Sequence, residues 1–600
     1  MKLNDRLIKF LRKLHFIIRV LNFLQLLFKA FNTFPSETDD PGGTSAPPSS
    51  SNQPMNATLD PANLQLDPGV TFWAPPPASN QPINDTLLDP ASLQLLDFRL
   101  RHPRPVGVLT TSAGKPLEVR ESLTLNTDVF NNPYFHDLQT SLDQERIPER
   151  VVHAKGNGAF GYFEVTNDVS KYTSADVFND VGKRTPLAAR FSGVIPSIGG
   201  SDLTIGTRGF AVKMYTNEGN LDFLGLHLPV YFYRYLNMFS TLSHGFKRNP
   251  KTNLIDPTMR AELLTVVPES IHNFMRLLSD YGQPNGYRKM DGHLLHTYEL
   301  NNKHGESFFV KFSMRSEQGT EYLTEVSAAR ITALDPDYFG RDLYNAIATG
   351  NYPSWRFEMD VMTKEQITKV NFNPFDVTRT WDNGTYKTVT IGRIVLNRNP
   401  DNFFRDVEQA AYNPGNLVPG IPGPPDDMYK TRRMAYRDTQ NYRLGINNNN
   451  IEVNRPKYRK VYNRDGHSPV RDNMRDAPNY YENSFNGPVP YVDVARPRER
   501  LKIYDRNAVD LQPPADFYNE QSEGGKTRLA TNAAVGLLVN AVPFVQERAL
   551  KLFYLIDRDL GRRVELALAA ARATKAVPTV VTPINDNPRV VEVVPNPIPR

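Results

Sequence analysis

The stretch RVVHAKGNGAFGYFEV, residues 150–165, places an arginine and a histidine before a glycine-rich segment that lies between two β-type runs. Far downstream, RRMAYRDT at residues 432–439 would bring Arg432 and Tyr436 to one face of a helix, one turn apart. A guanidinium beside a phenol favours the phenolate, and a phenolate is a known axial ligand of haem iron. What the chain can do depends on whether these two stretches meet.

The composition is that of a soluble globular chain, with 40% hydrophobic and 22% charged residues. The net charge of +5 is concentrated at one end, because residues 1–33 carry seven Lys or Arg against one Asp. That segment is +6, so the remaining residues sum to −1, and a nearly neutral body gives no reason to expect nucleic acid. The absence of cysteine excludes disulfides, thiolate-bound haem, iron–sulfur clusters and cysteine-based zinc sites.

Residues 1–33 are expected to be a separate basic and apolar segment. Arg19 interrupts the apolar run, and the uninterrupted part is too short for a transmembrane helix. A signal peptide or signal anchor, a mitochondrial-type presequence, an interfacial helix and a plain basic extension all remain open. We expect this segment to direct the protein to secretion or to a membrane surface. The last residues, NPIPR at 596–600, are not a peroxisomal signal.

Residues 34–107 are expected to form a flexible arm rich in Pro, Ser and Asn. The segment beginning SNQPMNATLDP at residue 51 recurs as SNQPINDTLLDP at residue 79. Two copies are too few for a solenoid, so the arm either wraps a neighbouring subunit or acts as a tether. Asn56, Asn84 and Asn383 stand in glycosylation sequons, whose use the sequence does not decide.

Residues 108–400 are expected to hold the β-rich body. Short apolar or aromatic runs separated by Gly, Asn and Asp predict strands at 161–165, 187–191, 209–215, 308–312 and 389–396. Helical patterns at 268–279 and 401–411 lie between or after them. The fold class predicted is therefore α+β, with a closed or strongly curved antiparallel sheet.

The rest of the chain divides into three further parts. Residues 401–500 are irregular and rich in Pro, Asn and Arg, which is typical of a segment that wraps a larger body. Residues 501–580 turn helical, with Pro543 breaking the pattern, and residues 581–600 form a tail.

The spacing Gly156-x-Gly158-x-x-Gly161 matches a dinucleotide-binding fingerprint. That fingerprint requires a helix after the glycines, whereas the residues that follow are strand-like. We expect these glycines to form a tight turn instead.

Several long runs resemble one known family. They are ERIPERVVHAKG at 145–156, RGFAVK at 208–213, LNRNP at 396–400 and APNYYENSF at 477–485. From about residue 108 to 485 the chain resembles the monofunctional haem catalases of the small-subunit type. The resemblance implies an antiparallel β-barrel with a wrapping loop and a C-terminal helical domain, ferric haem b, and a homotetramer.

The resemblance also implies site residues. His153 matches the distal acid–base, and Ser192 matches the serine bonded to it. Tyr436 matches the tyrosinate on the iron, with Arg432 beside it. The matches to the residues that hold the haem propionates and pack over the ring are Arg150, Arg190, Arg443 and Phe239.

Departures from the family pattern are concentrated on the distal side. Leu226 stands where the family has an asparagine that polarises peroxide, and leucine donates no hydrogen bond. Ile205 and Gly206 replace an Arg-Asp pair of the access channel, and Tyr235 and Leu236 replace an Asp-Pro pair. We therefore expect a more apolar distal side and a lower rate with hydrogen peroxide.

The family's secondary NADPH site is also expected to be weakened. His272 and Trp381 match it, but Tyr281 and Asn383 replace an arginine and a histidine that hold the cofactor. We therefore expect no tight NADPH binding. The imidazole of His227, next to Leu226, is expected to point away from the distal side because side chains alternate along a strand.

Three functions remain open. The first is a slowed catalase that converts two H₂O₂ to two H₂O and O₂. The second is a haem enzyme of the same fold that acts on organic or lipid hydroperoxides. The third is a non-enzymatic haem or structural protein, which the presence of His153, Ser192 and Tyr436 argues against.

Overall fold

Antiparallel strands form a sheet that closes on itself. The computed structural model describes residues 89–122, 131–235, 237–467, 470, 472–481, 483, 486–493 and 510–574, together with the backbone of 582–583 and 591–592. In the described part, the sheet runs in the order β5-β4-β3-β2-β1-β9-β8-β7-β6, and β5 also pairs with β7. All strands of the sheet except β6 therefore belong to one closed ring. The predicted barrel is confirmed.

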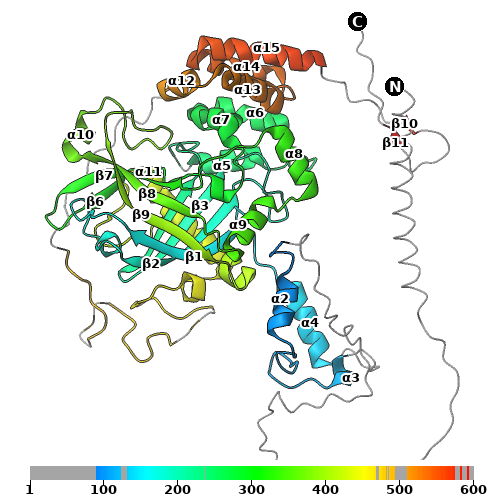
Figure 1. Ribbon diagram of the computed structural model, residues 1–600, viewed down its shortest axis with the longest axis vertical. Helices are drawn as coiled ribbons and strands as arrows, with labels where there is room; N and C mark the ends of the chain where they lie inside the picture. Colours follow the sequence, from blue (N-terminus) through cyan, green and yellow to red (C-terminus); the bar gives the residue numbers. More distant parts are fainter. Residues whose placement is uncertain are drawn as a thin grey trace, which may run out of the picture. The chain divides into compact units, whose positions relative to one another are not determined.

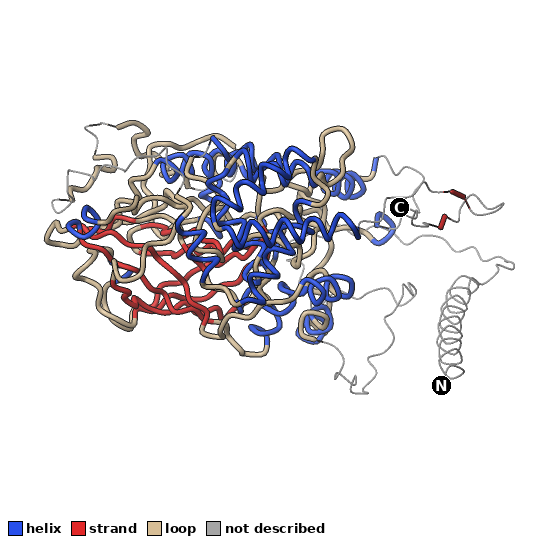
Figure 2. Tube along the Cα trace, turned by 90° about the horizontal axis from the view of Figure 1, so that it is seen from above, coloured by secondary structure: helices blue, strands red, loops and turns tan. Residues whose placement is uncertain are grey.

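The strand bounds contain the apolar runs that predicted them. The barrel strands are β1 (Gly156–Val165), β2 (Arg184–Gly193), β3 (Arg208–Thr216), β4 (Gly219–Leu226), β5 (Gly292–His293), β6 (Tyr298–Asn301), β7 (Ser307–Ser316), β8 (Ser354–Thr363) and β9 (Lys387–Arg398). A separate pair is formed by β10 (Thr582–Pro583) and β11 (Val591–Glu592). Figure 2 shows the barrel strands gathered in one body with helices alongside.

Aromatic side chains fill the barrel interior. The rings of Phe163 and Phe357 meet edge to face, with centroids 5.7 Å apart. Phe312 stacks on Phe357 at 5.3 Å, and Phe223 joins the same cluster. Aromatic rings bury a large apolar area and prefer such offset or edge contacts, so this cluster is the packed core of the barrel.

The expected tight turn at the glycines of residues 156–161 is wrong, because all three glycines lie within β1. Each gives room for a close neighbour. A Cβ on Gly161 would lie 1.8 Å from the Val395 carbonyl oxygen, where the register with β9 shifts, and one on Gly156 would lie 2.3 Å from the Phe191 carbonyl oxygen. Glycine inside a strand often marks such a close backbone approach.

Helices lie before, between and after the strands. The α-helices before and between the strands are α2 (Gln94–Arg101), α3 (Val119–Ser122), α4 (Pro133–Gln144), α5 (Asn237–Phe246), α6 (Pro257–Val266), α7 (Ile271–Leu278), α8 (Glu325–Leu334), α9 (Tyr338–Ala348) and α10 (Lys364–Lys369). The α-helices after β9 are α11 (Asp427–Leu444), α12 (Gln512–Asn519), α13 (Glu523–Asn532), α14 (Pro543–Ile556) and α15 (Arg558–Thr574). Short 3₁₀-helices are η4 (Asp176–Phe178), η5 (Pro268–Ser270), η6 (Asp280–Gly282), η7 (Tyr287–Lys289), η9 (Asn448–Asn450) and η10 (Glu452–Asn454), and the π-helices are η8 (Phe404–Glu408) and η11 (Ala533–Leu538).

The last four α-helices pack beside α6 and α7, at the top of Figure 1. Leu264 of α6 and Phe553 of α14 belong to one buried cluster, separate from the barrel core. Pro543 begins α14, where a proline costs no hydrogen bond because the first amides of a helix have no partner. The break expected at this residue is therefore a helix start.

The helix expected at 401–411 is much shorter in the structure. Only the π-helix η8 forms there, because the Asp406 carboxylate accepts the backbone N–H groups of Asp401 and Asn402. A side chain that bonds the preceding backbone competes with regular helix hydrogen bonding. This turn carries Glu408.

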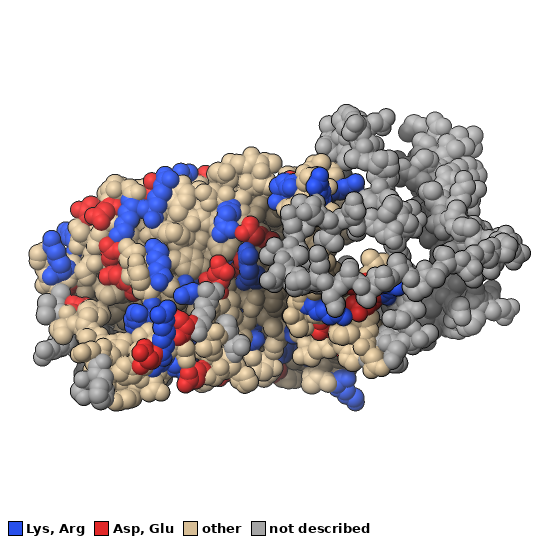
Figure 3. Space-filling view, turned by 90° about the horizontal axis from the view of Figure 1, so that it is seen from below, with Lys and Arg blue, Asp and Glu red and all other residues tan. Residues whose placement is uncertain are grey.

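Some expectations fall on residues outside the described part. These are the basic segment 1–33, most of the 34–107 arm with both repeat copies, Leu236, and most of the 581–600 tail. Within the described residues no helix is both long and apolar enough to span a bilayer. On the face drawn in Figure 3, basic and acidic side chains are interspersed.

Candidate functional site

His153 stands three residues before β1, in an unusual backbone conformation. Its φ of +66° lies in the left-handed region, which few non-glycine residues adopt, and its N–H donates to the Val194 carbonyl at 3.0 Å. On the adjacent strand β2, Ser192 Oγ lies 2.8 Å from His153 Nδ1. With Nδ1 held by the serine, Nε2 is left free to act on a bound molecule.

A glycine on the next strand makes room for this pair. Ser192 pairs with Gly156 on one side and with Gly209 of β3 on the other. A Cβ on Gly209 would lie 2.7 Å from both His153 Nδ1 and Ser192 Oγ. The close contact between imidazole and hydroxyl therefore requires glycine at this position.

The imidazole of His153 is held in its neutral form. Burial lowers its pKa to about 3, and the positive charges of Arg190, Arg432 and Arg150 act in the same direction. A neutral imidazole can accept a proton at its free nitrogen across the physiological pH range. His153 is therefore unprotonated at neutral pH, so Nε2 has a free lone pair for a proton from a bound molecule.

Arg432 and Tyr436 lie one turn apart on α11, as their spacing predicts. Arg432 Nη2 donates to the Tyr436 hydroxyl at 3.2 Å. Burial opposes the charge on Arg432, but Tyr436 and Tyr231 raise its pKa on balance. The guanidinium is therefore a permanent positive charge beside the phenol.

Sequence reasoning missed two residues behind this pair. Arg432 Nη1 lies 2.7 Å from His296 Nε2, and His296 Nδ1 lies 3.0 Å from the Asp426 carboxylate. Asp426 also accepts the Tyr429 N–H at 2.8 Å and so caps the start of α11. One chain of hydrogen bonds runs from a buried carboxylate through an imidazole and a guanidinium to the phenol. No sequence motif links residues 130 positions apart, so only the fold reveals it.

Two further predicted arginines meet at the π-helix η8, and a third is held by backbone carbonyls. Glu408 accepts from Arg150 at 3.2 Å and from Arg443 at 2.7 Å. Arg190 donates to the carbonyls of His153 and Ala154, yet its Nε is buried without a partner. Arg443 is also tied to the Pro148 carbonyl at 2.8 Å.

The stretches at residues 150–165 and 432–439 meet on one cavity of about 250 Å³. Its lining includes seven of the eight predicted site residues, which are Arg150, His153, Arg190, Ser192, Phe239, Arg432 and Tyr436. Arg443 is not among the lining residues, and it reaches the site through Glu408, which it shares with Arg150. Buried polar groups in an otherwise largely apolar cavity are the usual composition of a cofactor site.

The catalase family model matches residues 110–487, which is more than half of the chain. The chain belongs to the catalase family. A second model, described as catalase-related immune-responsive, matches residues 510–568, the segment of helices α12 to α15.

Curated relatives match over most of their own length. Catalase of Rattus norvegicus is 42% identical over 80% of this chain and 93% of its own. Catalase of Drosophila melanogaster is 42% identical over 81% and 99%. Among solved structures, catalase A from Saccharomyces cerevisiae has a TM-score of 0.72 at 34% identity, covering 78% of this chain and 99% of its own.

The residues around the cavity of about 250 Å³, hereafter the haem cavity, fit haem, the cofactor that the family implies. Arg190 lines this cavity, and its Nε is buried without a hydrogen-bond partner. It can therefore donate to an anionic group such as a propionate. Tyr436, backed by Arg432, supplies a phenol oxygen as a ligand, and Phe239 of α5 supplies apolar surface.

The distal wall of this cavity is apolar. Leu226 lines it, at only 6% exposure, together with Val194 and Ile195 from the segment after β2. Gly206, at the family's channel position, is not among the lining residues, and its carbonyl accepts from Arg208. Among the described residues that line the cavity, no asparagine stands near His153 to polarise a bound peroxide.

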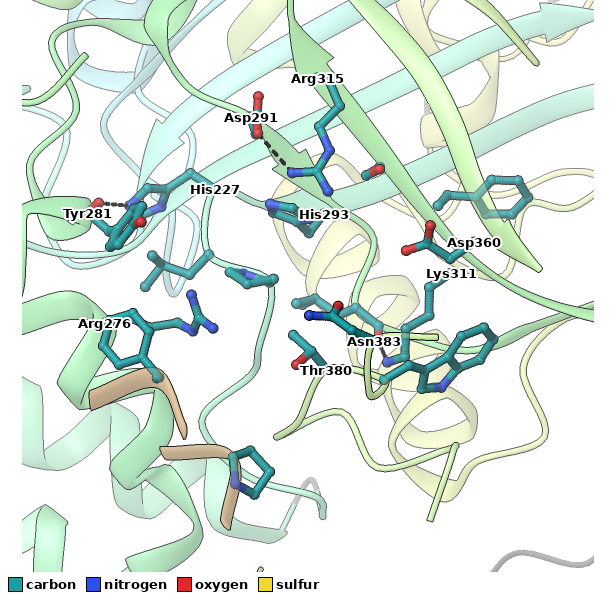
Figure 4. Close-up of a pocket in the computed structure, with 18 of the residues that line it drawn as sticks. His227, Arg276, Tyr281, Asp291, His293, Lys311, Arg315, Asp360, Thr380 and Asn383 are labelled. Carbon is teal, nitrogen blue, oxygen red and sulfur yellow. Dashed lines mark hydrogen bonds and ion pairs between the residues drawn. The ribbon is translucent and has the colours of Figure 1, made fainter. Parts of the chain in front are cut away.

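A second cavity has a volume of about 440 Å³ (Figure 4) and contains residues that the sequence analysis matched to a secondary NADPH site. Trp381, Tyr281 and Asn383 line it, as expected from the sequence. His272 does not, because its Nδ1 lies 3.2 Å from the Thr378 carbonyl and its Nε2 accepts from Arg276.

His227 also belongs to this second cavity, as the alternation of side chains predicts. Its Nδ1 accepts the Arg208 N–H at 2.9 Å, and its Nε2 lies 3.0 Å from the Tyr281 carbonyl. Both ring nitrogens are therefore occupied, so His227 cannot replace the missing distal asparagine.

Proposed function

We propose that this protein is a haem-dependent oxidoreductase of the catalase type, which converts two H₂O₂ to two H₂O and O₂. The observation that carries the proposal is that the neutral His153, fixed by Ser192, lines the same cavity as the Arg432–Tyr436 pair. A base and a metal-binding phenol on one cavity are the parts that peroxide chemistry on haem iron requires.

The chain's own residues have distinct roles in this proposal. Tyr436 would hold the iron of ferric haem b, while Arg150 and Arg190 would neutralise the propionates. Arg443, expected from the sequence to share this role, would support Arg150 through Glu408, to which both guanidinium groups are paired. When bound, haem supplies the two-electron redox chemistry of peroxide cleavage. His153 Nε2 would take a proton from one peroxide oxygen and return it to the other, and Ser192 would keep the imidazole oriented.

Leu226 is proposed to slow this reaction. A preorganised donor that meets the reacting oxygen typically contributes about 10²–10³ in rate, and leucine offers none. The same apolar wall favours a second candidate, turnover of organic or lipid hydroperoxides, whose hydrocarbon part would pack against Leu226, Val194 and Ile195.

Three further assignments belong to the proposal. A homotetramer is expected from the family, whose members assemble so. Tight NADPH binding is not expected, because Tyr281 stands in place of the arginine clamp and His272 is held by Arg276. Residues 1–33 are proposed to direct secretion or membrane association, which cell fractionation of the full-length protein against a deletion of 1–33 would test.

The deciding experiment compares two substrates on the purified, haem-loaded protein. O₂ release per haem from millimolar H₂O₂ is measured with an electrode, and consumption of cumene hydroperoxide is measured in parallel. Release of O₂ that disappears in His153→Gln, with the haem spectrum retained, is the expected result. Bound haem with no O₂ release but rapid cumene hydroperoxide turnover would replace the first function by the second. Purified protein that binds no haem would overturn both.

A further inference from the structure

The second cavity contains an arrangement of basic groups that the proposed function does not use. Arg276 of α7 and Lys311 of β7 both line it, and Figure 4 shows His293 between them and Arg315. Neither Arg276 nor Lys311 forms an ion pair with any described residue. Both side chains are half-buried, and two cations without a carboxylate partner on one cavity are suited to receive an anionic ligand.

Arg276 is held in place but left with free donors. Its Nε donates to His272 Nε2 at 3.0 Å, and its guanidinium lies over the Phe517 ring, 4.3 Å from the centroid. His272 is fixed in turn by the Thr378 carbonyl. The Nη groups of Arg276 have no hydrogen-bond partner among the described residues, and Figure 4 shows them directed into the cavity. These donors have the fork geometry that suits phosphate or carboxylate.

Lys311 is the second unpaired cation. Its Nζ donates one hydrogen bond, to the Leu295 carbonyl at 2.9 Å, and lies 6.0 Å from the Trp381 ring centroid. An ammonium group has three donors, so two remain for a ligand. Burial lowers the pKa of Lys311 to about 8, and the carboxylates of Asp376 and Asp426 limit that shift.

His293 lies within the field of the surrounding basic groups. Burial lowers its pKa well below the usual value, and Arg315, Arg276, His227 and Lys311 lower it further. Its ring makes no hydrogen bond with a described residue and lines the cavity. A bound anion would remove the electrostatic cost that these groups share.

The remaining charges limit how many anionic groups a ligand in this cavity can carry. Arg315 is already paired with Asp291 at 2.9 Å. Asp360, Asp516 and Glu520 also line the cavity, the last two being exposed. These carboxylates would repel a ligand with several phosphates, so the cavity suits one anionic group.

The rest of the lining indicates what the anionic group is attached to. Aromatic rings surround the cavity, namely Tyr281, Tyr322, Trp381, Tyr386 and Phe517. Tyr281 contacts Tyr322 edge to face at 5.1 Å, and Phe517 lies 6.0 Å from Tyr281. Planar rings stack favourably on such surfaces. We propose that this cavity binds a small planar-ring compound with a single phosphate or carboxylate, held by Arg276 and Lys311.

Isothermal titration calorimetry on the haem-loaded protein tests this proposal. The probes are adenosine monophosphate, benzoate, inorganic phosphate and NADPH. We expect one of the two ring anions to bind more tightly than phosphate, and NADPH to bind no more tightly than that ring anion. Arg276→Gln and Lys311→Met should each weaken that binding at least about tenfold. Arg528→Gln is the matched control, because it removes a surface guanidinium paired with Asp280 outside the cavity lining.

Thermal unfolding without ligand gives an independent readout. If the two cations exist for a ligand, Lys311→Met and Arg276→Gln should raise Tm, because each removes a half-buried cation that forms no ion pair with a described residue. No binding of any probe at millimolar concentration overturns the proposal, as does binding that both cavity variants leave unchanged. A lower Tm in both variants would make the cations structural, and tighter binding of NADPH would overturn the single-anion assignment. None of these readouts depends on peroxide turnover.

Discussion

Leu226 and His227 are adjacent in the chain, yet each lines a different cavity. Leu226 is the last residue of β4 and lines the same cavity as His153. His227 follows the strand, accepts the Arg208 N–H and lies near the Tyr281 carbonyl. The end of this strand is thus the partition between the two cavities. The distal residue can therefore be changed without touching the second cavity.

Leu226→Asn should raise O₂ release per haem. The asparagine amide would supply the missing donor in the haem cavity, and one such donor is worth about 10²–10³ in rate. Because the side chain is buried, an increase of at least about tenfold is the expected lower limit. Leu226→Met is the matched control, because it changes packing without adding a donor. An equal gain in both variants would show that packing, not hydrogen bonding, limits the rate.

Gly209→Ala should disable the distal pair. The added Cβ would lie 2.7 Å from His153 Nδ1 and Ser192 Oγ, so the imidazole must move. We expect peroxide turnover per haem to fall at least about tenfold, as small displacements of catalytic groups commonly cause. Haem content, measured by the pyridine haemochrome spectrum, should stay the same. Gly199→Ala, where a Cβ meets nothing within 4 Å, should have normal activity.

His227→Gln should reduce the acid sensitivity of the fold. Burial and the charge of Arg208 lower the pKa of His227 from 6.5 to about 3. Between these values the unfolded chain binds a proton that the folded chain does not, so this contribution to stability is full above pH 6.5 and falls as the pH drops towards 3. Between pH 7.5 and 5.0, urea unfolding of the unmodified protein should lose about 2 kcal/mol through this residue. If His227→Gln lost the same free energy of unfolding over this pH range, His227 would not be the source of the loss.

Asp426→Asn should separate two roles of one carboxylate. Asparagine still caps α11, so the free energy of unfolding should change by less than about 1 kcal/mol. The negative charge that Asp426 places beside His296 is lost, so the hydrogen-bond chain supplies less electron density to Tyr436. The ferric/ferrous potential of the haem-loaded protein should rise by on the order of tens of mV in a spectroelectrochemical titration. Asp426→Ala should add the loss of the cap. An unchanged potential in Asp426→Asn would show that the chain does not reach the iron.

Local patterns predicted the elements that carry strong periodicity. The strand at 389–396 lies within β9, and the four-residue spacing of Arg432 and Tyr436 predicts their contact on α11. The glycines of β1 were misassigned, because a turn and a close strand contact both require glycine and only the neighbouring strands distinguish them. Local sequence therefore indicates that these positions need glycine, but it does not indicate that the cause is a close contact between strands.

Contacts between distant segments could not be predicted. His296 and Asp426 are separated by a large part of the chain, and neither stands in a recognisable motif. Glu408 was assigned to a regular helix, whereas Asp406 turns that segment into a π-helix and so brings Glu408 between Arg150 and Arg443.

The pairing of β1 with β9 has a consequence for how the protein is made. The barrel needs the first and last of its long strands side by side, so a nascent chain cannot close it until residue 398 has left the ribosome. His153 precedes the first strand and Tyr436 follows the last, so the haem cavity does not exist until Tyr436 has also emerged. Capture of haem is consequently a late event of synthesis, and the partly made chain must be kept from aggregating while its strand edges are unpaired.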